Sequence, residues 1–198
     1  MKVLIACEFS AVVRDAFTEA GHDATSCDLE PSATNGKHYQ GDVRDLLGDR
    51  WDLMIAFPPC THLAASGARH FEQKRRDGRQ KQAIDFFLQL ANADIPKIAI
   101  ENPVGIMQHH YKKHSQLIHP WQFGHKMSKP TCLWLKNLPC LVPTDIVEKG
   151  EFVTLPNGSR MAKWYYEASK KPAKERTKLR NTTFTGIAAA MAAQWGKE

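Results

Sequence analysis

Residues 51–61 read WDLMIAFPPCT, an apolar run that ends in two prolines, a cysteine and a threonine. The apolar part predicts a buried strand, and the prolines predict its end. Further along the chain, a second apolar run at Lys97–Ile100 leads into Glu101 and Asn102. A thiol, Cys60, and a carboxyl group, Glu101, are thus each expected just past the carboxyl end of a parallel strand. That edge is where open α/β sheets bind their ligands.

The pattern around these runs alternates strands with helices, which predicts βαβ crossovers and a mostly parallel sheet. The expected strands are Lys2–Ala6, Asp23–Cys27, His38–Gln40, Trp51–Phe57 and Lys97–Ile100. Helices are expected from an N-cap at Ser10 to Gly21, from Gln80 to Asn92, and from Ile187 to Trp195. Later strands at Trp121–Phe123 and Thr131–Leu135, and a hairpin arm at Glu151–Leu155 before the turn Pro156-Asn157-Gly158, are expected to be antiparallel. The predicted fold class is α/β, a doubly wound, mostly parallel sheet with an antiparallel C-terminal edge.

The composition is typical of one globular domain, with 198 residues, 42% hydrophobic and 24% charged. No apolar run approaches the roughly 20 residues that cross a bilayer, and the first residues lack the plan of a signal peptide. Five cysteines without Cys-x-x-Cys spacing and nine histidines without His-Glu-x-x-His spacing argue against a disulfide framework and a metal site. We expect a cytoplasmic monomer with no membrane partner and no metal.

Positive charge is concentrated in one segment. Between Arg160 and Arg180 there are eight Lys or Arg residues and two Glu residues, which matches the net charge of +6 of the whole chain. Trp164, Tyr165 and Tyr166 lie among them, and a pattern of cations and aromatic rings favours nucleic acid. A second basic cluster follows Cys60. The predicted nucleic-acid-binding residues are Arg75, Arg76, Arg79, Lys170, Lys171 and Lys174. The stretch Ser169–Arg180 has almost no apolar residues and is expected to be mobile.

Polar and aromatic residues also follow the first three predicted strands. Phe9 and Ser10 follow the first, Asp28 ends the second and Asp42 follows the third. An acid after the second strand can accept hydrogen bonds from ribose hydroxyls, and Phe9 could stack on an adenine that bonds Asp42. The first turn lacks the Gly-x-Gly-x-x-Gly pattern, because Ala11 and Val13 stand where glycines would. An adenosyl cofactor without phosphates therefore fits better than NAD.

The order of these motifs resembles that of the S-adenosylmethionine-dependent DNA cytosine-5 methyltransferases, and most closely their short, phage-borne members. The resemblance includes Pro-Pro-Cys after the fourth strand, Glu-Asn-Pro after the fifth, and the stretches 121–125, 131–135 and 180–186. It implies the methyltransferase type of doubly wound sheet, a single catalytic domain over residues 1–198, and a DNA substrate. Residues 126–180 would form a small hairpin and basic arm in place of a full target-recognition domain. A phage-encoded chain would act in the host cytoplasm.

Position by position, the resemblance implies that Cys60 adds to C6 of a cytosine and that Glu101 protonates N3 or hydrogen-bonds to it. It also implies that Asn102 holds the loop. Contacts to S-adenosylmethionine would come from Phe9, Ser10, Asp28, Asp42, Pro58 and Pro59. A cytosine ring resists attack until N3 is protonated, so thiolate and carboxyl must act together. A free thiol has a pKa of roughly 8.5, so the site is expected to favour the thiolate. Residues 64–82 would be a mobile catalytic loop with hinges at Gly67 and Gly78.

The chain departs from the family in two places. The first turn lacks the usual glycines, and only about 60 residues lie between Gly124 and the final helix, where larger members have a target-recognition domain. The chain also has no clear counterpart of the family's Gln-x-Arg-x-Arg element, for which Gln122 is a weak candidate. Target selectivity is expected to be short or loose. Three alternatives stay open: methylation of a pyrimidine in RNA or in a free nucleotide, a catalytically silent nucleic-acid-binding protein, and a cysteine hydrolase. The hydrolase would have to use His62, and no third orienting group is evident for it.

Overall fold

The structure is a computed structural model that describes residues 1–197, apart from the side chains of Lys174 and Lys178. Its centre is a seven-stranded sheet with the order β3-β2-β1-β4-β5-β7-β6. The parallel strands are β1 (Lys2–Ala6), β2 (Asp23–Asp28), β3 (His38–Gln40), β4 (Leu53–Ala56) and β5 (Lys97–Pro103). Strands β7 (Thr131–Lys136) and β6 (Gln116–Ile118) complete the sheet in antiparallel pairing. The predicted mostly parallel sheet with an antiparallel C-terminal edge is confirmed.

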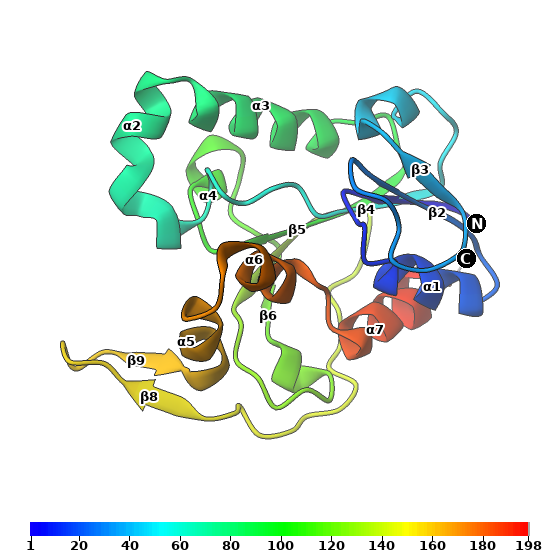
Figure 1. Ribbon diagram of the computed structural model, residues 1–198. Coiled ribbons are helices and arrows are strands. Elements are labelled where there is room, and N and C mark those ends of the chain that lie inside the picture. The colour runs from blue at the N-terminus through cyan, green and yellow to red at the C-terminus, as the bar shows by residue number, and fades with distance from the viewer. Residues whose placement is uncertain (198) are drawn as a thin grey trace.

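Helices cover both faces of this sheet. Helices α1 (Val12–Glu19) and α7 (Thr185–Trp195) lie together on one face, and α3 (Arg79–Ala91) lies on the other (Figure 1). Successive residues of a strand point to opposite faces, so Ile5 and Ile55 pack in the cluster with α1 and α7. Their neighbours Leu4 and Met54 pack in the cluster with α3. Burial on both faces explains why the central strands β1, β4 and β5 have continuous apolar runs rather than alternating ones.

The remaining elements are short. They are η1 (Val43–Leu46), η2 (Ala65–His70), α2 (Phe71–Arg76), α4 (Met107–His110), η3 (Pro120–Gln122), β8 (Phe152–Thr154), β9 (Arg160–Ala162), α5 (Lys163–Ser169) and α6 (Ala173–Asn181). Strands β8 and β9 form the predicted hairpin, which extends away from the sheet beside α5 (Figure 1). Over residues 1–197, none of the helices combines the length and the apolar character needed to cross a membrane. In the same range, His, Cys, Asp and Glu side chains form no group of three that could hold a metal.

The strand predicted at Trp121–Phe123 is wrong. Residues Pro120–Gln122 form the 3₁₀ helix η3, and the strand that pairs with β7 is Gln116–Ile118. Proline explains the difference, because its fixed φ suits the first turn of a helix and its missing N–H removes a bond from a sheet ladder.

Two segments expected to be mobile or irregular contain helices. The stretch Ser169–Arg180 holds most of α6, which starts after Pro172, and Glu175 in its first turn forms an ion pair with Lys171, which lies just before the helix. Charged residues can form a helix without an apolar face when such pairs lie one turn apart. Residues 64–82 hold η2, α2 and the start of α3, and the proposed hinge Gly78 is the N-cap of α3 with φ of 81°. Within this segment Lys74 is buried, and its Nζ donates a 2.6 Å hydrogen bond to the Thr61 carbonyl.

Candidate active site

Two neighbouring strand ends bring Cys60 and Glu101 to the same edge of the sheet. Ala56 at the end of β4 pairs with Ile100 of β5, and Glu101 comes next along β5. Glu101 lies inside β5 rather than past its end, because antiparallel pairing with Leu133 of β7 extends the strand. The acid is therefore held by a sheet ladder, whereas the thiol sits on the turn that follows β4.

Asn102 ties this turn to β5. Its side chain is 2% exposed, and its Nδ2 donates a 2.8 Å hydrogen bond to the carbonyl of Pro58. The Oδ1 atom of Asn102 is buried and makes no hydrogen bond to any described residue. The predicted role of Asn102 in holding the loop agrees with this contact, although the contact alone says nothing about chemistry.

A close backbone approach holds the other side of the turn. The N–H groups of Leu63 and Ala64 donate to the Cys60 carbonyl at 2.9 Å, and the N–H of Ile106 donates to the Leu63 carbonyl at 3.0 Å. A Cβ atom on Gly105 would lie 2.2 Å from that Leu63 oxygen, so only glycine fits there. The turn that carries Cys60 is thus attached to the chain both before and after it.

Two cations from distant parts of the chain act on the pair. Lys129 precedes β7 and Arg180 lies in α6, and the Lys129 Nζ donates a 2.8 Å hydrogen bond to the Arg180 carbonyl. The Arg180 guanidinium lies 3.8 Å from the centre of the Tyr165 ring. The sequence motifs do not indicate Lys129, and they place Arg180 only in the basic segment and in the stretch 180–186. No local pattern indicates that either cation lies near Cys60, because their positions depend on contacts between segments far apart in the chain.

Burial and charge set the protonation of the pair. Burial raises the pKa of Cys60, the Glu101 carboxylate raises it further, and Lys129 and Arg180 oppose the rise. Burial also raises the pKa of Glu101 against the pull of Lys129. The expectation that the site favours the thiolate is therefore wrong for the free protein. When Glu101 takes up a proton, however, its negative charge beside the sulfur disappears, so protonation of the acid eases ionisation of the thiol.

This coupling predicts opposite effects of two substitutions on the pKa of Cys60. Glu101→Gln removes a negative charge and should lower the pKa, whereas Lys129→Met removes a positive charge and should raise it. Iodoacetamide alkylation followed over pH, with the peptides resolved by mass spectrometry, measures both shifts. The exposed Cys140 serves as an internal reference in each variant. A shift of the Cys60 midpoint in the same direction in both variants would contradict the assignment.

Glu8 caps the first helix, so the predicted cap at Ser10 is wrong. Glu8 is 4% exposed and accepts hydrogen bonds from the N–H groups of Val13 at 2.8 Å and Arg14 at 3.2 Å. The Ser10 hydroxyl donates to the same carboxyl group at 3.1 Å. In dinucleotide-binding folds this helix N-terminus receives a phosphate. Here a side chain of the protein already occupies it, which agrees with the expectation that a pyrophosphate has no cradle.

The first turn keeps a glycine-like backbone without a glycine. Ala11 has φ of 64°, in the left-handed region, and is fully buried at the N-cap of α1. The carbonyl of Phe9, two residues earlier, accepts a 2.8 Å hydrogen bond from the N–H of Ala33. The loop after β2 thus folds back onto the turn and closes over it.

The two predicted cofactor acids lie at the ends of β2 and β3. Asp28 is partly exposed, and its Oδ1 accepts a 3.0 Å bond from the N–H of Glu30. Leu29 beside it is 72% exposed, an unusual position for a large apolar side chain. Asp42 caps η1 and forms an ion pair with Arg44, which lowers the pKa of Asp42. Of the other predicted contacts, Pro58 is buried and Pro59 is exposed on the Cys60 turn.

Five of the six predicted nucleic-acid-binding residues are exposed, but several of these already have acidic partners. Ion pairs join Arg76 to Glu72, Arg79 to Asp77 and Lys171 to Glu175. Arg75 is exposed on α2, and the Lys170 Nζ lies 4.1 Å from the centre of the Tyr166 ring. The side chain of Lys174 lies outside the described residues. Pairing within the protein reduces the charge that the paired cations present to a polyanion.

Comparison with known proteins supports the fold. No family model matches the chain, and no curated protein matches it. Among solved structures, it is similar to an E. coli prophage-encoded protein assigned as a DNA modification methyltransferase, with 16% identity and a TM-score of 0.50. The match covers 75% of this chain and 52% of that one, so the chain spans about half the length of the solved structure. At this identity the similarity shows a shared methyltransferase-like α/β fold.

Proposed function

We propose that this protein transfers a methyl group from S-adenosylmethionine to C5 of a cytosine in DNA. The observation that carries the proposal is that Cys60, on the turn after β4, and Glu101, in the adjacent strand β5, lie at one edge of the sheet, with Asn102 hydrogen-bonded to the turn that carries Cys60. A silent binding protein would need neither the half-buried thiol nor the half-buried acid. The prophage-encoded structural neighbour, which is assigned to DNA modification, supports DNA as the substrate.

In the proposed reaction Cys60 and Glu101 act on opposite sides of one ring. Glu101, whose raised pKa keeps a proton available, donates it to N3 of the cytosine. The Cys60 sulfur, as thiolate, forms a bond to C6, and the electron pair moves to C5. S-adenosylmethionine, when bound, supplies the electrophilic methyl group. Loss of the C5 proton to water, cleavage of the S–C6 bond and return of the N3 proton to the Glu101 carboxylate then regenerate the free cysteine and the acid.

Lys129 and Arg180 would support this reaction electrostatically. Both lower the pKa of Cys60, and they approach from the loop before β7 and from α6. The chain has no clear Gln-x-Arg-x-Arg element, and these two cations would fill the same need for positive charge near the base. The target base must leave its stack to reach the pair.

The features of the first three strand ends fit S-adenosylmethionine. Glu8 occupies the helix N-terminus where a phosphate would bind, so a cofactor without phosphates suits the site. Asp28 has one carboxylate oxygen with no donor among the described residues, available to ribose hydroxyls. The exposed Leu29 and the partly buried Phe9 offer apolar surface for the adenine.

We also propose that residues 1–198 form a single catalytic domain. Residues 126–180 contain the hairpin β8–β9, α5 and most of α6, and would act as a small substitute for a target-recognition domain. Such a small region leaves room for few base contacts, so recognition of the target sequence should be short or loose.

The direct test supplies methyl-labelled S-adenosylmethionine with a cytosine-containing DNA duplex, the matching single strand, the matching RNA, or free cytidine nucleotides. Mass spectrometry of the digested nucleosides identifies the product. We expect 5-methylcytosine from DNA. Methylated product from RNA alone or from the nucleotides alone would support the proposed reaction but show that DNA is not the substrate. The absence of label from all four substrates would refute the proposed function.

Cofactor binding gives a separate prediction. S-adenosylhomocysteine should bind with a micromolar Kd, about −8 kcal/mol. Asp28→Ala should cost about 1.5–3 kcal/mol, because a charge-assisted bond to the ribose is lost. Isothermal calorimetry measures both, with Asp49→Ala as a control that removes the same charge from an exposed position. Absence of heat and of any thermal shift with the wild type would exclude this cofactor.

A further inference from the structure

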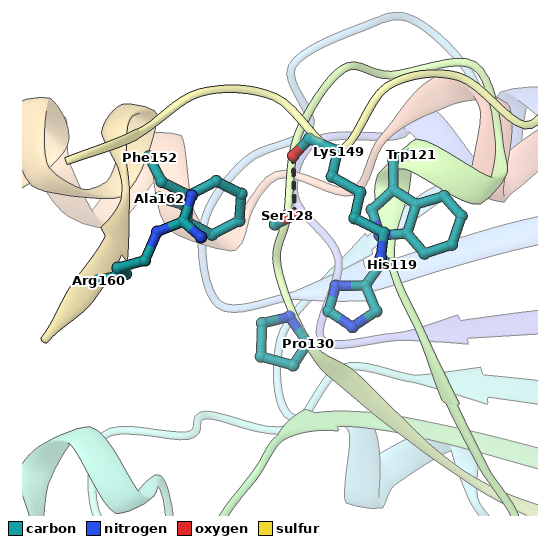
Figure 2. A pocket seen from close by; sticks show the side chains of 8 residues that line it. All are labelled: His119, Trp121, Ser128, Pro130, Lys149, Phe152, Arg160 and Ala162. Atoms are coloured by element: carbon teal, nitrogen blue, oxygen red, sulfur yellow. Dashed lines mark hydrogen bonds between the residues drawn. The ribbon is translucent and has the colours of Figure 1, made fainter. Parts of the chain in front are cut away.

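A cavity of about 390 Å³ lies outside the proposed catalytic pair, between the segment 119–130 and the hairpin β8–β9 (Figure 2). Two of its lining residues, Trp121 and Phe152, are aromatic and two, Lys149 and Arg160, are cations. None of the lining residues is acidic. Arg160 begins the basic segment 160–180, and none of the lining residues is among the six predicted nucleic-acid contacts.

The two cations are held over aromatic rings rather than over carboxylates. The Lys149 Nζ lies 5.2 Å from the centre of the Trp121 ring, and the Arg160 guanidinium lies 4.9 Å from that of Phe152. In the described part of the chain, neither cation forms an ion pair. A ring face orients a cation but does not neutralise it. Both charges thus remain available to an anion in the cavity.

Trp121 adds an unused donor. The indole N–H groups of the other four tryptophans each donate to a backbone carbonyl at 2.7–2.9 Å. The indole N–H of Trp121 has no such acceptor among residues 1–197. His119 stands beside Trp121, and burial together with Lys149 lowers its pKa, so at neutral pH it adds a neutral polar group. The polar groups of the cavity are therefore mainly donors, which suits an anion that carries several oxygen acceptors.

Hydrogen bonds fix the walls of the cavity. The Ser128 hydroxyl donates a 2.7 Å bond to the Lys149 carbonyl, drawn in Figure 2, and the Trp164 indole donates a 2.9 Å bond to the Ser128 carbonyl. Gly150 has φ of 78°, and a Cβ atom there would lie 2.4 Å from the carbonyl oxygen of Lys126. The base of the hairpin is thus held closely against the segment that leads into β7.

The cavity connects along the chain to the proposed catalytic edge. Pro130 lines the cavity, and its neighbour Lys129 acts on the pKa of Cys60 and of Glu101. Thr131 next to it pairs with Pro103 at the end of β5. A strand whose target base reached Cys60 would therefore pass close to the cavity with its neighbouring nucleotides.

We propose that this cavity binds a backbone phosphodiester of the substrate strand close to the target nucleotide, with Lys149, Arg160 and the Trp121 N–H as its donors. The inference rests on the proposed function for the identity of the strand. Phosphate contacts of this kind position a strand without reading its sequence. By fixing the position of the strand along the protein, the cavity would do part of what a large target-recognition domain does in larger enzymes.

The test compares two double variants. The cavity variant carries Lys149→Met and Arg160→Met together, and the matched control carries Lys81→Met and Lys126→Met together. The control removes two exposed lysines that already pair with Asp85 and Glu148. Fluorescence anisotropy of a labelled, cytosine-containing DNA measures affinity over a range of salt concentrations. The cavity variant should bind at least about tenfold more weakly, and its salt slope should fall by about 1–2 units. The control should keep both close to the wild-type values.

Three further measurements sharpen the outcome. Trp121→Phe, which keeps a ring and removes the N–H, should weaken binding without changing the salt slope. Calorimetry with S-adenosylhomocysteine should be unchanged in the cavity variant, which shows that it is folded. Inorganic phosphate at constant ionic strength should not displace the DNA, and displacement would assign the cavity to free phosphate instead.

Failure of this inference and failure of the proposed function are distinguishable. Wild-type methylation of DNA with equal salt slopes in the cavity and control variants would overturn the phosphate site alone. DNA binding that depends on Lys149 and Arg160, without methyl transfer to any substrate, would keep the site and refute the proposed function. A wild type that binds no DNA would overturn the site.

Discussion

Cys60→Ser should abolish methyl transfer while leaving the affinity for S-adenosylhomocysteine unchanged. A serine hydroxyl is far less acidic than a thiol and does not form the bond to C6 under the same conditions, whereas the adenosine contacts lie at other strand ends. Turnover is measured with labelled S-adenosylmethionine, and affinity by calorimetry. Methylation retained at a substantial rate in this variant would contradict the assigned nucleophile.

A DNA oligonucleotide with 5-fluorocytosine at the target should trap the wild type covalently. After methyl transfer C5 carries fluorine in place of the proton whose loss releases the enzyme, so the bond between Cys60 and C6 remains. Peptide mapping should place the adduct on Cys60. Burial raises the pKa of Cys27 to about 12 and that of Cys132 to about 11, and Cys7 is raised as well, so these thiols stay protonated near neutral pH. An adduct on any of them, or on Cys140, would refute the mechanism. A covalent adduct formed with RNA and not with DNA would support the mechanism and show that the substrate is RNA.

Glu101→Gln should slow methyl transfer by roughly 10²–10⁴-fold, the usual contribution of a positioned general acid. Glutamine keeps the shape of the side chain and can still hydrogen-bond, but it has no acidic proton for N3. Glu148→Gln is a matched control at an exposed site, and it should leave the rate unchanged. Equal rates for Glu101→Gln and the wild type would remove Glu101 from the mechanism.

The pH dependence of this pair separates a chemical role from a structural one. The wild type needs a protonated Glu101 and an ionised Cys60, so its rate should rise and then fall with pH. The two apparent pKa values of this profile belong to the coupled pair rather than to either residue alone. Glu101→Gln removes one of the two titrations. Its slower rate should therefore only rise with pH, as Cys60 ionises. A variant profile that still falls at high pH would point to a different acid.

Local sequence patterns were sufficient for the framework of the fold. The apolar runs of β1, β4 and β5 and the apolar face of α3 predicted their elements, because burial and periodicity act over a few residues. The position of Cys60 and Glu101 at one edge followed from parallel strand topology. One error came where a short pattern had two meanings, because Pro120 converted an expected strand into a 3₁₀ helix. The charged stretch 169–180 holds most of α6, which its composition did not indicate.

The environment of the site depended on tertiary structure. Glu8, rather than Ser10, caps α1, because its carboxyl group folds back onto the N–H groups of Val13 and Arg14. The side chain of Arg14 itself is 1% exposed and holds the loop after β2 through Ser32 and Asn35, which no apolar pattern would predict.

By itself, the sequence determined the sheet, its ligand-binding edge and the two side chains proposed for chemistry, since these follow from local periodicity and from the order of strands. Only the tertiary structure decided the protonation of the pair and the cations around it. The pKa of Cys60 depends on its burial, on Glu101, and on Lys129 and Arg180. A pKa depends on distances and on water exclusion in space, and these distances join segments that the sequence keeps far apart.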